Sequence, residues 1–126
     1  MVTAAARRAE APWHARRVFA VFRLRAAAEQ AAELRSSVEV LLAALAERAG
    51  FRGGEFGRAA EDPTLWALVT RWDGVGAYRR ALSAGPVKIA GAPVWVYAVD
   101  EPGVFLEDTE GGTPAGDAAT RGSEGG

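Results

Sequence analysis

The sequence predicts an α+β domain in which an antiparallel sheet carries its helices on one face. Three observations support this prediction: segments that alternate with period two, segments with apolar residues every three or four positions, and the order of these segments. The chain has 126 residues, 49% of them hydrophobic, and a formal net charge of −1, which fits one folded domain. We expect residues 1–17 to be a mobile extension, 18–107 the domain and 108–126 a disordered tail.

The composition argues against several classes of protein. Cysteine is absent, which excludes disulfides, thiolate nucleophiles and cysteine-based metal sites. No stretch approaches the roughly 18 consecutive apolar residues that a membrane span requires, and no apolar segment follows Arg7 and Arg8 as in a signal peptide. The arginines are scattered among acidic residues rather than clustered. We therefore expect a cytoplasmic protein that binds neither membrane nor nucleic acid.

The first predicted strand and helix follow each other directly. Val18–Arg25 alternates, and Phe19 and Val21 begin a second apolar face at the start of the strand. From Ala27 onward the spacing changes to three and four residues, which predicts a helix with one apolar stripe: Ala27, Ala31, Leu34, Val38, Leu41, Leu42 and Leu45. Gly50 is predicted to stop this helix in the left-handed conformation.

Two further strands are predicted around a turn at Asp62-Pro63. Phe51–Ala59 is the second strand, and its glycines precede a strand without the spacing of a nucleotide-binding loop. Proline favours a turn at its position, so we expect the third strand to follow it, over Thr64–Trp72. Both alternating sets of this strand are apolar, which predicts cover on both faces: Leu65, Ala67 and Val69 on one, Trp66, Leu68 and Trp72 on the other.

The last part of the domain is predicted to hold a second helix and a final strand. The helix covers Asp73–Ala84, with Asp73 as its capping residue, and ends at Gly85-Pro86. Gly103–Leu106 is the final strand. The stretch between them is ambiguous: residues 86–92 fit a helical turn, and residues 94–99 fit either a strand or a short buried helix.

This order of elements, strand, helix, strand, strand, helix, strand, is the ferredoxin-like βαββαβ arrangement. Two helices can cover only one face of such a sheet, yet two of its strands are apolar on both faces. An exposed apolar patch of that size is uncommon on a monomer, so the sequence predicts that a second copy covers it in a homodimer.

Several segments resemble the antibiotic biosynthesis monooxygenase family, a family of dimeric α+β barrels. They are Gly50-Phe51-Arg52-Gly53-Gly54, the stretch from Asp62 to Asp73, Ala77-Tyr78-Arg79 and Val87-Lys88. The resemblance extends over roughly residues 18–107. It implies two sheets that meet as a barrel, and a pocket between sheet and helices in each subunit.

The resemblance also implies a chemistry. Quinone-forming members of the family oxidise electron-rich phenols with molecular oxygen and without flavin, haem or metal, so it implies no cofactor. Trp72 and Tyr78 match the family's tryptophan and tyrosine at the same separation, and are the candidate catalytic residues. The candidate substrate-binding residues are Phe22, Trp66, Leu68 and Lys88. A buried Lys88 of lowered pKa would accept the phenol proton.

Departures from the family pattern keep other functions open. Leu68 stands where those members carry an asparagine, and Ala92 falls about where they carry an arginine. A non-catalytic, dimeric small-molecule-binding module is therefore the alternative, with Trp72 and Tyr78 as packing residues. The haem-degrading branch uses a histidine just after the second helix, where this chain has Gly91; its one histidine, His14, precedes the domain, which argues against haem degradation.

No cluster of residues predicts a metal site. Asp62, Asp73 and Asp100 fit turn and cap positions, and no carboxylate pair or histidine cluster has the spacing of metal ligands.

Overall fold

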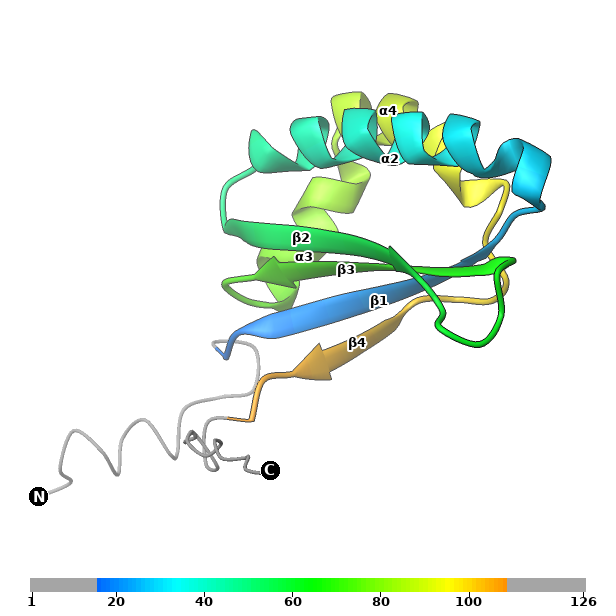
Figure 1. Ribbon diagram of the computed structural model, residues 1–126. Helices are drawn as coiled ribbons and strands as arrows, with labels where there is room; N and C mark the ends of the chain where they lie inside the picture. The colour runs from blue at the N-terminus through cyan, green and yellow to red at the C-terminus, as the bar shows by residue number, and fades with distance from the viewer. Residues whose placement is uncertain (1–15, 109–126) are drawn as a thin grey trace, which may run out of the picture.

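The computed structural model describes residues 16–108, which form a ferredoxin-like α+β domain (Figure 1). Its antiparallel sheet has the strand order β2-β3-β1-β4. The strands are β1 (Val18–Arg25), β2 (Phe51–Arg58), β3 (Leu65–Trp72) and β4 (Gly103–Leu106). The predicted fold class is thus confirmed. The predictions for the N-terminal extension, including His14, and for the tail concern residues that lie almost entirely outside the described range.

The helices cover one face of this sheet. A short 3₁₀ turn, η2 (Ala28–Gln30), leads into α2 (Ala31–Ala46), and α3 (Val75–Ser83) is followed at once by α4 (Gly85–Trp95). Figure 1 shows α2 and α4 running side by side above the sheet. Among residues 16–108, no helix is long and apolar enough to cross a membrane.

The core lies between this helix layer and the strands β1 and β3. The predicted stripe of α2 supplies four residues that are fully buried: Leu34, Val38, Leu41 and Leu45. They meet the alternate residues of β1 and β3, which pair across the two strands as Phe22 with Leu68 and Leu24 with Trp66. The 3.6-residue period of the helix and the two-residue period of the strands therefore produce one apolar layer.

The opposite face of the sheet has no helix over it. Phe19 and Phe105 stack there with their ring centroids 5.4 Å apart, and Phe105 remains 49% exposed. Val21 and Val69 are cross-strand partners on the same face and are half-buried. The second apolar set predicted for β1 and β3 thus lies on a face that the described chain leaves open.

Three predictions about local structure need correction. Gly74, not Asp73, is the N-cap of α3, and no side chain caps this helix; the Asp73 carboxylate instead accepts a hydrogen bond of 2.8 Å from Arg52. Residues 85–95 form one helix, which buries Val87, Gly91 and Val94 and packs against α2. Gly50 has the predicted left-handed φ of 88°, but it lies beyond the end of α2.

Candidate functional site

Trp72 and Tyr78 come together at one end of the helix-covered face of the sheet. Trp72 is the last residue of β3 and Tyr78 lies in the first turns of α3, with ring centroids 6.1 Å apart in an edge-on arrangement. Phe22 of β1 continues this aromatic cluster, 6.4 Å from the Tyr78 ring. All three side chains are buried. The structure therefore brings together three of the six site residues that the sequence predicted.

A tight connection between α2 and β2 fixes the position of α3 against the sheet. Gly50 adopts a positive φ, and a Cβ atom at this position would lie 2.5 Å from the Cβ of Ala77. Its carbonyl accepts a hydrogen bond of 2.8 Å from the backbone N–H of Asp73. Because only glycine combines this φ with this contact at low cost, Gly50 allows α3 to start directly beside the end of β3.

The polar groups of Trp72 and Tyr78 differ in their hydrogen bonding. The Trp72 indole N–H donates a hydrogen bond of 2.9 Å to the Thr70 hydroxyl, and both groups are buried. The Tyr78 hydroxyl makes no hydrogen bond with any residue from 16 to 108. Of these two residues, Tyr78 is therefore the one with a polar group available to a ligand.

Burial strengthens the preference of Tyr78 for its protonated form. Desolvation raises the pKa of its hydroxyl above the ordinary value, and the positive charge of Arg79 offsets part of this rise. The phenol form therefore predominates at neutral pH, and Tyr78 can donate a hydrogen bond but does not serve as a phenolate base.

An apolar hollow of about 200 Å³ adjoins the aromatic cluster at Phe22. Trp95, at the end of α4, stacks on the Phe22 ring with centroids 4.8 Å apart. The hollow is lined by Phe22, Arg23, Leu82, Trp95, Ala98, Asp100 and Pro102. Its one ion pair, between Arg23 and Asp100 at 3.5 Å, is exposed on both sides. The site thus combines an apolar aromatic wall with a polar rim.

Leu68 and Lys88 lie in contrasting surroundings. Leu68 is completely buried opposite Phe22, so this position holds an apolar side chain inside the core. Lys88 is exposed on α4, and no residue from 16 to 108 forms an ion pair with it.

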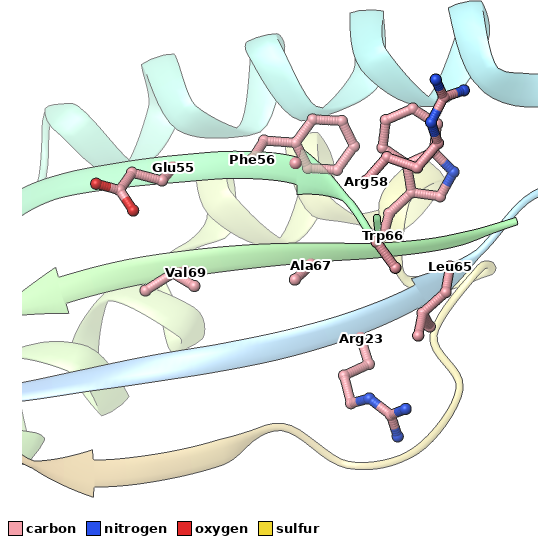
Figure 2. A pocket seen from close by; sticks show the side chains of 10 residues that line it. Arg23, Glu55, Phe56, Arg58, Leu65, Trp66, Ala67 and Val69 are labelled. Carbon is pink, nitrogen blue, oxygen red and sulfur yellow. The ribbon is translucent and has the colours of Figure 1, made fainter. Parts of the chain in front are cut away.

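Trp66 belongs to a second group at the other end of β3. Its ring stacks on Phe56 with centroids 5.1 Å apart, and the guanidinium groups of Arg35 and Arg58 each lie 5.3 Å from the ring centroid. A hollow of about 390 Å³ borders Trp66, Phe56 and Arg58 (Figure 2). Six residues of strand place Trp66 about 20 Å from Trp72. The predicted site residues therefore divide between two regions.

The sequence analysis missed Thr70 and Trp95. Thr70 is the only polar residue on the covered face of β3, and a hydroxyl two residues from a tryptophan was a usable signal for a hydrogen bond to the indole. Trp95 was hidden because residues 94–99 were ambiguous between strand and helix. On a helix, its spacing of four residues from Gly91 would have placed the two on one face.

The described residues contain no group of three or more histidines, cysteines or carboxylates that could hold a metal ion.

The fold and the aromatic cluster define a small α+β domain with an apolar pocket, and comparison with known proteins names the family. The family model for antibiotic biosynthesis monooxygenases matches residues 17–90, more than half of the chain. The protein belongs to this family. No curated protein shows significant sequence similarity to it.

Solved structures of low sequence identity share the fold. SnoaB, a cofactor-independent oxygenase from Streptomyces nogalater, is 22% identical, with a TM-score of 0.67 over 79% of this chain and 100% of SnoaB. A candidate antibiotic biosynthesis monooxygenase from Caulobacter crescentus is 17% identical, with a TM-score of 0.64 over 77% and 92%. A conserved protein of unknown function from Bacteroides thetaiotaomicron is 8% identical, with a TM-score of 0.66 over 74% and 99%.

Proposed function

We propose that this protein is a cofactor-independent monooxygenase that oxidises a phenolic or polycyclic aromatic small molecule with molecular oxygen. The observation that carries the proposal is the hydroxyl of the buried residue Tyr78, which has no partner among the described residues and belongs to an aromatic cluster beside an apolar hollow. Family membership and the fold shared with SnoaB support it.

The chemistry requires an electron-rich carbon and a dry site. In the overall reaction, a ring methylene and O₂ give a carbonyl and water, so one oxygen atom enters the substrate and the other leaves as water. Loss of the phenol proton makes the ring electron-rich enough to react with O₂, and an apolar site protects the anion from reprotonation by water. The carbon and the anion come from the substrate, so the protein supplies shape, dryness and hydrogen bonds.

Each member of the cluster receives a role in this proposal. The phenol lies in the hollow against Phe22, whose ring turns aside so that the substrate oxygen reaches the Tyr78 hydroxyl. Tyr78 donates a hydrogen bond to the developing phenolate, because its raised pKa keeps it protonated. Trp72, held by Thr70, forms the rigid aromatic floor next to Tyr78. The exposed Lys88 has no part in this arrangement.

Oxygen consumption tests the proposal. Dihydroxynaphthalenes, with two fused rings, are the substrates, and hydroxyanthrones, with three, are tested for comparison. Each rate is compared with the rate without enzyme. We expect Tyr78→Phe to lower kcat by about 10²-fold with little change in binding, because only the hydrogen bond to the anion is lost. Lys88→Ala is the matched control and should leave kcat unchanged. If oxygen is consumed no faster than without enzyme for every phenol tried, the proposed monooxygenase activity is refuted.

A specific observation supports a second function, a non-catalytic small-molecule-binding module. Leu68 places a buried apolar side chain where the quinone-forming members have a polar amide, and the Trp72 N–H is already bonded to Thr70. A pocket with few polar groups still binds flat apolar molecules. In that case Tyr78→Phe would leave the affinity for an aromatic ligand unchanged, and no variant would consume oxygen.

We also propose that the protein acts as a homodimer. The stack of Phe19 on Phe105 and the neighbouring Val21 and Val69 leave an apolar patch on the open face of the sheet. A second copy that packs on this patch would remove it from water. Light scattering at micromolar concentration should give the dimer mass, and Phe105→Asp should give the monomer. A monomer mass for the parent protein would contradict the dimer.

A further inference from the structure

Trp95 is the outermost ring of the aromatic cluster. It is the last residue of α4 and half-buried, and its ring lies nearly parallel to that of Phe22, at an angle of 27°. The Phe22 ring in turn lies 6.4 Å from the Tyr78 ring, and Phe22 and Trp95 line the hollow, whereas Tyr78 does not. The indole of Trp95 therefore forms the outer wall of the proposed substrate site.

Gly91 gives this indole its position. A Cβ atom at Gly91 would lie 2.5 Å from the Trp95 Nε1 and 2.9 Å from its Cε2, closer than real Cβ atoms approach. Residues four apart on a helix share a face, so the missing side chain at position 91 lets the indole lie flat against α4. Flat against the helix, the ring is held toward Phe22 by packing, and no residue from 16 to 108 bonds its nitrogen.

The volume of the hollow limits what it can hold. It measures about 200 Å³. An apolar cavity of about 150 Å³ binds benzene, and drug-sized ligands occupy roughly 300–1,000 Å³. One substituted ring or two fused rings fit a hollow of this volume, and three fused rings exceed it.

The rim suits an oxygen-bearing ring. Arg23 and Asp100 face each other at 3.5 Å and are both about half-exposed, so their pairing is weak and replaceable. The guanidinium can donate to a hydroxyl or carbonyl oxygen of the ligand, and the carboxylate can accept from a hydroxyl. The apolar wall and this rim together match a small phenol.

We infer that Trp95 is a specificity-determining residue that limits the proposed substrate site to phenols of one or two fused rings. This inference rests on the proposed function for the location of the site. Trp95 acts by occupying the space that a third ring needs.

The experiment compares ligands of two sizes by titration calorimetry. The probes are 1-naphthol, with two rings, and 1-hydroxyanthraquinone, with three, neither of which needs to react. We expect the parent protein to prefer 1-naphthol, and Trp95→Ala to shift the ratio of the two affinities toward 1-hydroxyanthraquinone by about tenfold or more. Ile89→Ala, on the exposed face of α4, is the matched control and should leave the ratio unchanged.

A conservative variant separates specificity from folding. Trp95→Phe keeps a ring against Phe22 and removes one ring of volume, so its affinity ratio should fall between those of the parent and Trp95→Ala. Unfolding curves of all variants check that each is folded. A ratio that stays at the parent value in both folded variants would overturn the inference, and so would a parent protein that binds neither probe or prefers the larger one.

Oxygen uptake distinguishes this inference from the proposed function. If 1-naphthol binds and Trp95→Ala shifts the ratio, but no phenol consumes oxygen, the size limit stands and the monooxygenase fails. If phenols consume oxygen and the ratio does not respond to position 95, the monooxygenase stands and the role of Trp95 fails.

Discussion

Trp72 and Trp66 occupy the same face of β3, six residues apart, and both are buried, with exposures of 0% and 3%. Trp72 bonds its N–H to Thr70 and meets only other rings, Phe51 at 5.1 Å and Tyr78 at 6.1 Å. Trp66 has a buried N–H without a partner and two arginines over its ring. Figure 2 shows the latter group, with Arg58 and Phe56 beside Trp66.

This difference shows that residue type and burial do not identify a site on their own. Around Trp72, every polar group except the Tyr78 hydroxyl is satisfied, so that single hydroxyl is the chemically significant feature. Around Trp66, the guanidinium groups of Arg35 and Arg58 lie over the ring, where a cation is attracted to the face of an aromatic ring. Trp66 is therefore best understood as a packing residue.

The largest expected effect is on stability, at the end of β3 where Trp72 lies. Trp72→Ala should lower the free energy of unfolding by about 3–5 kcal/mol, because it removes a fully buried ring and leaves a cavity. Urea unfolding measures the loss. A loss below about 1 kcal/mol would mean that the surrounding rings collapse into the space and that Trp72 is not a rigid floor.

Phenylalanine substitutions compare the two tryptophans directly. Trp72→Phe leaves the buried Thr70 hydroxyl without its partner, which costs about 1–3 kcal/mol. Trp66→Phe removes an N–H that has no partner, so it should cost clearly less. Equal losses in urea unfolding would show that the hydrogen bond to Thr70 does not distinguish the two ends.

An alkaline titration tests the environment of Tyr78. Its folded-state pKa is raised above the unfolded value of about 10, so the folded state holds the proton more tightly. The stability from this group is complete below about pH 10 and is lost as pH rises through the folded pKa. The free energy of unfolding of the parent protein should fall above about pH 10. The free energy of unfolding of Tyr78→Phe should fall less steeply with pH. Identical slopes for the two proteins would contradict the desolvation of the Tyr78 hydroxyl.

The smallest effect is expected at the turn before Trp66. Hydrogen bonds from the Thr64 hydroxyl and backbone N–H, then the bond from Arg25, lower the pKa of the Asp62 carboxyl. Its contribution is present above the unfolded pKa and is lost as pH falls through the folded pKa. Asp62→Asn should reduce stability slightly at neutral pH and flatten its decline in acid. If stability declines in acid as steeply in Asp62→Asn as in the parent protein, this turn forms without the carboxylate.

The sequence by itself determined the sheet, the first helix and the family. Val18–Arg25 and Thr64–Trp72 are apolar at alternate positions that a sheet buries, and the stripe from Leu34 to Leu45 has one helical solution. The resemblance to the family also singled out Trp72 and Tyr78, which the structure places 6.1 Å apart. These features depend on local periodicity, which is visible in the sequence.

Tertiary structure alone decided the remainder. Whether residues 94–99 continue a helix depends on α4 packing against α2, because a short apolar run buries equally well as strand or helix. The separation of Trp66 from the site is a distance along β3 that composition does not reveal. Trp95 reaches Phe22 only because Gly91 and the sheet lie where they do. Contacts between residues far apart in sequence are set by the packing of whole elements, and local pattern does not encode them.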